Sequence, residues 1–248
     1  MYTFTGYNMR VKRMINFKNT LTTEAIVIWR KKLKNYSKFT LISYHCGLIT
    51  CTMDHKRLQR LKNASYLTPF SKIYITINPT RDHYHIEQID GITIFSTIEG
   101  NLESIAYTSI ISELILKLTA KEDMDTSLYE LVNQFSQMIH TKSIKLASLI
   151  MGWQLLMLAG FTPDREAILS NNGLSEFWKE LAHITPSPIT SEVQSGLLEV
   201  LTYQWNHKET INLNKSVWQK IEFLLYAYAA YQLNDQLQSV QFLKDIVL

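Results

Sequence analysis

The feature that most constrains the fold is a change in apolar periodicity close to Gly100. Before Gly100, apolar and polar residues alternate in short runs rich in β-branched and aromatic side chains, which is typical of β-strands. After it, apolar residues recur at the i, i+3, i+4 spacing of amphipathic helices, as in Leu102–Leu118. A block of strands followed by a block of helices predicts two units.

The first part of the chain is predicted to form about five short strands, bounded by Asn, Gly, Pro or charged residues. The predicted strands are Glu24–Trp29, Phe39–Tyr44, Leu48–Met53, Lys72–Ile77 and Tyr84–Ile89, the last with a candidate extension over Ile92–Phe95. Because no long helix interrupts them, these strands are typical of a small closed barrel or a sandwich.

The second part is predicted to be helical throughout. The predicted helices are Asn101–Leu118, Ser127–His140, Lys142–Gly160, Leu174–His183, Ser191–Asn206, Lys215–Leu233 and Asp235–Val247. The fold class is therefore α+β and multidomain, with a strand-rich domain over residues 22–99 and an all-α domain over residues 100–248. Residues 1–21 precede both as a basic extension without the apolar run of a signal peptide.

One segment needs a test for membrane insertion, because Leu146–Pro163 carries no charged residue. Its strongly apolar part is shorter than the roughly 20 residues that a membrane span needs. We therefore expect a buried core helix and no membrane association.

The charge is divided unevenly between the two parts. Residues 1–85 hold 15 Lys and Arg against 3 Asp and Glu, a net +12, whereas residues 86–248 carry a net −9. Such an asymmetry predicts that the first part contacts a polyanion. The alternative is a solvated basic face without a ligand.

Motifs of known chemistry are largely absent. The chain has no GxxxxGK[ST] loop, no GxGxxG turn and no GxSxG elbow, so we expect no enzyme activity and no cofactor. His83 and His85 lie on one face of a predicted strand, but a metal site needs more ligands than these. Cys46 and Cys51 flank a turn; we expect reduced thiols, with a disulfide across the hairpin as the alternative.

Cations alternate with aromatic residues from Trp29 to Tyr74, which is the composition that single-stranded nucleic acid requires. Cations neutralise phosphates, and aromatic faces stack on unpaired bases. About half of these aromatics must instead fill the barrel. The predicted phosphate contacts are Arg30, Lys31, Lys32, Lys34, Lys38, Lys56, Arg57, Arg60 and Lys62, and the predicted stacking residues are Tyr36, Phe39 and Tyr66.

The stretch His55–Asn63 is interpreted as the connection between the third and fourth strands. Its cations have no acidic neighbour in sequence except Asp54, so we expect no internal ion pair there. Reversal of Arg57 and Arg60 to Glu is accordingly predicted to weaken binding while leaving the fold intact.

Five segments resemble the RecO family of DNA repair and recombination-mediator proteins. They are Thr23–Ile28 as the opening strand, Leu67–Phe70 as the family's LQPF element, Ile86–Asp90 as the last barrel strand, Leu102–Leu118 as the first helix, and Leu155–Asp164 as the LLxLLGYxPD helix end. The order and spacing of these segments match the family.

This resemblance implies an OB-fold followed by a helical domain. It also implies binding of single- and double-stranded DNA, annealing of complementary strands, loading of recombinase with RecR, and contact with the tail of single-strand DNA-binding protein. A bacterial cytoplasmic, nucleoid-associated location is expected. The acidic tail would need cations, and the candidates are Lys142 with Lys145, or Lys215 with Lys220. The alternative function is an RNA-binding or protein-docking OB module without annealing activity.

The chain departs from the family pattern in two places. Many members carry a four-cysteine zinc site after the proline–aspartate pair, whereas Arg165–Gly173 holds no cysteine. We therefore expect no metal, and we expect apolar packing to hold Leu174–His183. The extension over residues 1–21 is also unusual, and is either a flexible basic arm or a misassigned start.

Overall fold

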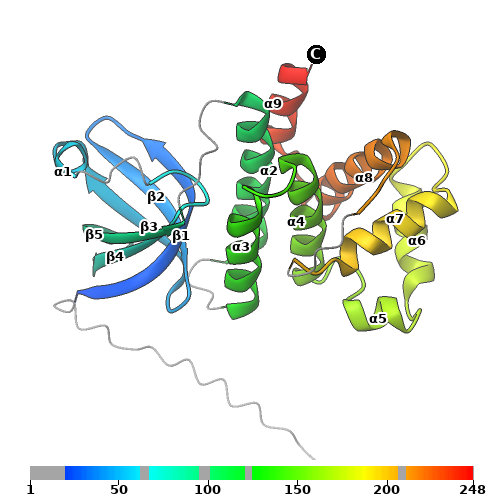
Figure 1. Cartoon of the computed structure of the whole chain (residues 1–248), viewed down its shortest axis with the longest axis horizontal. Helices are drawn as coiled ribbons and strands as arrows, with labels where there is room; N and C mark the ends of the chain where they lie inside the picture. Colours follow the sequence, from blue (N-terminus) through cyan, green and yellow to red (C-terminus); the bar gives the residue numbers. More distant parts are fainter. Residues whose placement is uncertain (1–19, 62–66, 95–100, 121–124, 206–210, 248) are drawn as a thin grey trace, which may run out of the picture.

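The computed structural model describes residues 20–61, 67–94, 101–120, 125–205 and 211–247. Its first part is a closed barrel with the strand order β1-β2-β3-β5-β4 (Figure 1). The strands are β1 (Leu21–Lys32), β2 (Tyr36–Ser43), β3 (Gly47–Asp54), β4 (Lys72–Pro79) and β5 (Tyr84–Ile94). Neighbouring strands are antiparallel except β3 and β5, which are parallel. This five-stranded barrel is the predicted OB-fold.

The helices follow the barrel. They are α2 (Leu102–Leu118), α3 (Thr126–Met138), α4 (Ile144–Leu158), α5 (Arg165–Leu169), α6 (Leu174–His183), α7 (Ser191–Thr202), α8 (Lys215–Leu233) and α9 (Gln238–Val247). Figure 1 shows α2 and α3 standing beside the barrel, with α9 next to α2 and with α5 to α8 on the far side. Five of the helices begin where a side-chain oxygen accepts a backbone N–H, at Asn101, Asp125, Asp164, Thr190 and Asn214.

The predicted strands and long helices are all present, and most boundaries agree within a few residues. The extension of the last strand is confirmed as far as Ile94, whereas Phe95 lies outside the described residues. Helix α6 has the predicted bounds. Leu174, Phe177 and Leu181 bury one face of α6, so apolar packing holds it as expected. Two short helices were not predicted: α5, and α1 (His55–Arg60) in the connection between β3 and β4.

The outer surface of the barrel is apolar where it meets the helices. Inside the barrel, Ala25 and Val27 join one buried cluster, whereas Ile26 and Ile28 on the opposite side of β1 join the core of the helical part. Ile42, Leu48 and Phe70 extend this second surface. The barrel and the helices therefore share one continuous hydrophobic core.

The segment Leu67–Phe70 takes part in both clusters. Leu67 is buried inside the barrel, and Phe70 is buried in the helical core with its ring edge-on to Phe135 at a centroid distance of 4.9 Å. Phe70 has a φ of 63°, a left-handed conformation that costs a non-glycine residue about 1–2 kcal/mol. Its complete burial, and the hydrogen bond that its N–H donates to the Val27 carbonyl at 2.6 Å, offset that cost.

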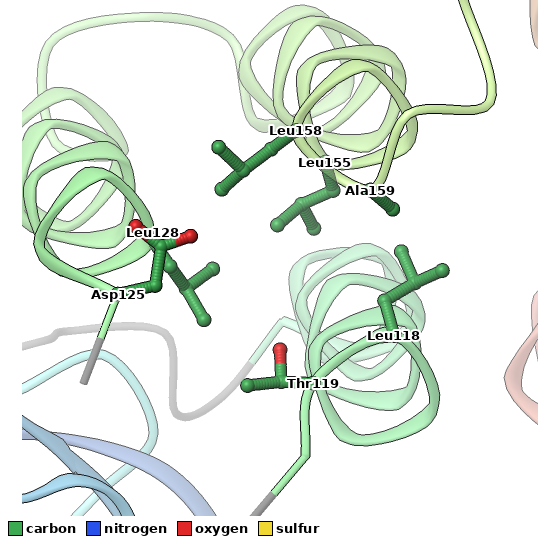
Figure 2. Close-up of a pocket in the computed structure, with 7 residues that line it drawn as sticks. All are labelled: Leu118, Thr119, Asp125, Leu128, Leu155, Leu158 and Ala159. Carbon is green, nitrogen blue, oxygen red and sulfur yellow. The ribbon is translucent and has the colours of Figure 1, made fainter. Parts of the chain in front are cut away.

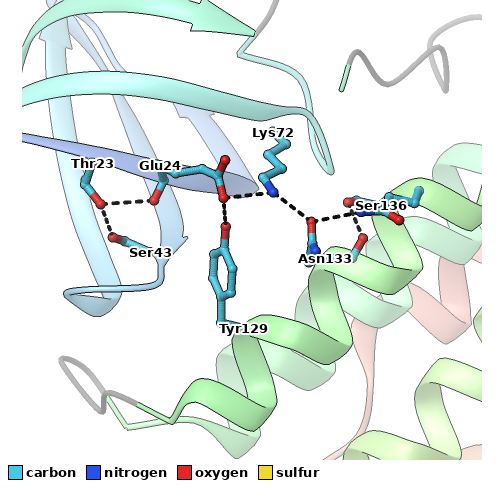
Figure 3. A network of polar contacts seen from close by, with 8 residues as sticks. Thr23, Glu24, Ser43, Lys72, Tyr129, Asn133 and Ser136 are labelled. Atoms are coloured by element: carbon cyan, nitrogen blue, oxygen red, sulfur yellow. Dashed lines mark hydrogen bonds and ion pairs between the residues drawn. The ribbon is translucent and has the colours of Figure 1, made fainter. Parts of the chain in front are cut away.

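A polar network also joins the barrel to α3 (Figure 3). Glu24 of β1 forms an ion pair of 2.8 Å with Lys72 of β4, and the hydroxyl of Tyr129 donates to the Glu24 carboxylate. Lys72 also donates to Asn133 at 3.1 Å. Burial raises the pKa of Glu24, but the hydrogen bonds from Lys72 and Tyr129 outweigh that effect and lower the pKa below its ordinary value.

The two cysteines and the uncharged segment are accounted for by the core. Cys51 is buried in β3 and Cys46 lies in the β2–β3 turn, and no disulfide joins them. Most of Leu146–Pro163 forms the buried helix α4. Within the described ranges, no helix combines the length and the apolar character needed to cross a bilayer.

Candidate nucleic-acid interface

A bulge in β1 decides which of its cations face outward. Val27 pairs with Leu41 of β2, but the next β1 residue with a partner is Trp29, which pairs with Thr40, so Ile28 is the extra residue. Directly opposed residues of an antiparallel pair share a face. The register after the bulge therefore places Trp29 and Lys31 on the outer surface.

The three consecutive cations of β1 consequently do not act together. Lys31 pairs with Lys38 on the outer surface, whereas Arg30 pairs with Phe39 and Lys32 pairs with Ser37 on the inner side. The Arg30 guanidinium lies 5.7 Å from the centroid of the Phe39 ring. Arg30 and Lys32 are nonetheless exposed, on the face of the β1–β2 pair opposite to Lys31 and Lys38.

A groove runs over the outer surface of β2 and β3, and we call it the sheet-face groove. Its volume is about 500 Å³. It is lined by Tyr36, Lys38, Thr50, Thr52, Met53, Asp54, Asp82, His83 and His85. OB-folds bind oligonucleotides on the face of these same strands and on the loops after β1 and β4.

The sheet-face groove offers the groups that an unpaired strand needs. Tyr36 is 39% exposed, and Trp29, on the same outer surface, is 40% exposed, so both rings can stack on bases. Lys38 and Thr50 line the groove and supply a cation and a hydroxyl, and Lys31, opposite Lys38 on the adjacent outer surface of β1, supplies a second cation. Within the described ranges neither lysine has a carboxylate at ion-pair distance, so their charge is available to a ligand.

A second groove lies between the β1–β2 loop and helix α1, and we call it the α1 groove. Its volume is about 760 Å³, and it is lined by Lys34, Asn35, Asp54, His55, Lys56, Arg57 and Arg60. Leu58 anchors α1 in the barrel core. Lys56 and Arg60 are four residues apart and therefore lie on one face of the helix.

The expectation that the connection forms no internal ion pair is wrong for Arg57. Its guanidinium lies 2.6 Å from a carboxylate oxygen of Glu87 on β5. This hydrogen bond lowers the pKa of Glu87 against a smaller opposing effect of burial. Glu87 is 30 residues away from Arg57 in sequence, so a search for acidic residues close to Arg57 in the sequence could not find this partner. A charge reversal that spares the fold must therefore use Lys56 and Arg60, not Arg57.

The predicted stacking residues have three different outcomes. Tyr36 lines the sheet-face groove. The prediction for Phe39 is wrong, because its ring is completely buried inside the barrel and presents no face to a base. Tyr66, together with the predicted phosphate contact Lys62, lies outside the described residues.

Several lining residues were not among the predicted contacts. Trp29 was noted in the aromatic run, but only the bulge shows that it faces outward. Thr50 and Thr52 carry no distinctive sequence signal. His83 and His85 were considered only as metal ligands, and they line the groove instead. In the part of the chain that the structure describes, no three His, Cys, Asp or Glu side chains are grouped to hold a metal ion.

Two further cavities lie among the helices. A pocket of about 230 Å³ lies between the ends of α2, α3 and α4, where Leu128, Leu155 and Leu158 line it together with Asp125 (Figure 2). A groove between α8 and α9, with a volume of about 460 Å³, is lined by Phe223, Tyr226, Tyr231 and Lys244 among others. We call it the α8–α9 groove.

Comparisons with known proteins agree with this architecture. The family model for the C-terminal part of recombination protein O matches residues 99–170, which include α2, α3 and α4. A DNA repair protein RecO of Caldanaerobacter subterraneus subsp. tengcongensis is 23% identical over 146 residues. That match covers 58% of this chain and 59% of the relative, so the chain spans about three-fifths of the length of the relative it matches.

Proposed function

We propose that this chain, a RecO-family protein, acts in DNA repair and recombination as a non-catalytic factor that binds single-stranded DNA along the sheet-face groove. The observation that carries the proposal is the outer surface of β1 and β2. There, the exposed rings of Trp29 and Tyr36 lie beside Lys31 and Lys38, which make no ion pair within the described ranges. The other predicted phosphate contacts that the structure describes, Arg30, Lys32, Lys34, Lys56 and Arg60, would add to the electrostatic attraction.

The chemistry of annealing follows from this surface. Cations that neutralise phosphates release condensed counterions, and they screen the repulsion between two strands held on the same protein. Rings stacked on bases hold a strand open, so its Watson–Crick edges stay available to a complement. Neither step needs nucleotide hydrolysis, which agrees with the missing phosphate-binding loop. Binding of double-stranded DNA would use the same cations without the stacking.

The proposed division of labour assigns DNA to residues 22–99 and protein partners to residues 100–248, in a bacterial cytoplasmic, nucleoid-associated protein. RecR, with which the chain would load recombinase, and the tail of single-strand DNA-binding protein are the proposed partners. The pocket in Figure 2 suits neither an acidic tail nor an acidic surface, because its rim carries Asp125.

The α8–α9 groove is the better place for an acidic tail. Lys244 lines it, and Lys220 lies nearby with its ammonium 5.6 Å from the centroid of the Phe223 ring. Of the other candidates, Lys145 is already paired with Glu103 at 2.7 Å. We expect Lys244→Glu to weaken binding of an acidic tail peptide about tenfold, since one charge-assisted contact contributes about 1.5 kcal/mol. Fluorescence anisotropy with a labelled peptide measures this, with Lys179→Glu on α6 as the matched control. Equal affinities for the two variants would remove the tail from this groove.

A salt series distinguishes DNA binding from the RNA or protein-docking alternative. Titrations of labelled single-stranded DNA and RNA, followed by anisotropy, should show tighter binding of DNA. The logarithm of the affinity should fall linearly with the logarithm of salt, with a slope of about −0.7 for each phosphate neutralised. Absence of DNA binding at low salt would contradict the proposal, and equal or tighter binding of RNA would favour the alternative.

A further inference from the structure

We propose that the sheet-face groove and the α1 groove hold two separate DNA strands on one protein molecule. The sheet-face groove would take a single strand through its bases, and the α1 groove would take the phosphate backbone of a second strand. This inference rests on the proposed DNA-binding function, and it deepens that function by giving each groove its own ligand.

The boundary between the two grooves is a carboxylate. Asp54 lines both of them and is exposed. It lies at the end of β3, directly opposite Tyr36, and no cation in the described ranges forms an ion pair with it. A phosphate backbone is repelled by a carboxylate, so a strand is disfavoured from crossing from one groove into the other at this point.

The two grooves also differ in chemistry. The lining of the sheet-face groove has one lysine against two carboxylates, so it suits bases better than a phosphate backbone. Its other polar and aromatic groups are the exposed Tyr36 ring, the hydroxyls of Thr50 and Thr52, and the imidazoles of His83 and His85. The lining of the α1 groove contains Lys34, Lys56, Arg57 and Arg60, and no Tyr, Trp or Phe. Rings and hydroxyls recognise unpaired bases, whereas a wall of cations recognises a backbone without regard to its bases.

Helix α1 is held in place, while Lys34, Lys56 and Arg60 of the α1 groove form no ion pair within the described ranges. Leu58 fixes α1 to the barrel core, Arg57 ties it to Glu87, and the His55 N–H donates to the Asn35 carbonyl at 3.3 Å. Lys56 and Arg60 then lie four residues apart on the free face of α1, where like charges repel. A phosphate backbone would relieve this repulsion, so the fold presents a preformed site for a polyanion.

The experiment uses two single strands that are not complementary, one with a donor dye and the other with an acceptor dye. At about 0.15 M salt the screening length is about 8 Å, which weakens the effect of a charge reversal outside its own groove. We expect energy transfer between the strands on the wild-type protein. The double variant Lys56→Glu/Arg60→Glu should keep first-strand affinity within about threefold and lose energy transfer at least tenfold. Loss of two cations should also lower the salt slope for the second strand by about 1.4.

Three comparisons make the test decisive. The variant Tyr36→Ala/Lys38→Ala should weaken binding of the first strand. The variant Lys179→Glu/Lys215→Glu, which changes the net charge as much as Lys56→Glu/Arg60→Glu does, should change neither readout. Sedimentation of the protein with both strands must show them on a single protomer. One strand per protomer on the wild type, or equal loss of first-strand affinity in both groove variants, overturns the two-strand proposal while DNA binding stands. No binding of any strand overturns the proposed function as well.

Discussion

Reversing both Lys31 and Lys38 to Glu should weaken binding of single-stranded DNA about 100-fold at about 0.1 M salt. The two lysines face each other across β1 and β2 beside Trp29 and Tyr36, and they make no ion pair within the described ranges. Each charge-assisted contact to a phosphate contributes about 1.5 kcal/mol, so two contribute about 3 kcal/mol, or two powers of ten. Anisotropy titration of a labelled strand gives the two affinities.

The adjacent cations on the same strand provide the matched control. Arg30→Glu/Lys32→Glu makes the same change in net charge, but these side chains lie on the inner side of the β1–β2 pair, against Phe39 and Ser37. This control variant should lower the affinity for single-stranded DNA no more than about tenfold, because its charges act on the strand only through the long-range electrostatic field of the protein. Equal losses for the two double variants would show that the outward face of β1 does not orient the strand. Thermal unfolding of each variant tests whether it retains the fold.

Replacing Lys72 with Met should lower the free energy of unfolding by about 2–3 kcal/mol. The Lys72 side chain is 11% exposed and that of Glu24 is 23% exposed, so the substitution leaves a largely buried carboxylate without its cation. Removing one partner of such an ion pair destabilises a protein more than removing both charges, because the remaining charge is left unpaired. The partial exposure of Lys72 and Glu24 reduces this loss in the free energy of unfolding. Urea unfolding of Lys72→Met and of Glu24→Gln/Lys72→Met measures the difference. If the double variant is no more stable than Lys72→Met, the unpaired Glu24 carboxylate is not the cause of the destabilisation.

The same pair should show a characteristic dependence on pH. Because the pKa of Glu24 in the folded protein lies below its ordinary value of 4.5, the stabilisation is fully present above pH 4.5 and is lost as the pH falls through the folded pKa. Lys72→Met removes the hydrogen bond that contributes to the lowering. The difference in stability between the wild type and Lys72→Met should therefore be largest at neutral pH and shrink in acid.

The fold could be predicted from the sequence because its main signals are local. Alternation between apolar and polar residues located the five strands, and the 3.6-residue period located the long helices. Helices α1 and α5 were missed because six and five residues are too few to show that period. The shared core between barrel and helices was also missed, since a run such as Ile26, Val27 and Ile28 does not say what covers its outer side.

The interface could be predicted only in part, because its decisive features are not local. Continuing the alternation from Ala25 and Val27 would turn Trp29 and Lys31 inward and Arg30 outward; the bulge at Ile28 reverses this. Phe39 was chosen for its place among cations, but its register places it inside the barrel. The pairing of Arg57 with Glu87 required knowing that α1 lies next to β5.

The segment Leu67–Phe70 has a consequence for the geometry of the proposed function. Leu67 is fixed in the barrel and Phe70 in the helical core, only three residues apart, and the network around Glu24 closes the same junction from β1. These contacts oppose a rotation of the barrel relative to the helices, including α8 and α9, which belong to the same core as Phe70. A partner protein docked on α8 and α9 would then approach a strand bound in the sheet-face groove in one defined orientation.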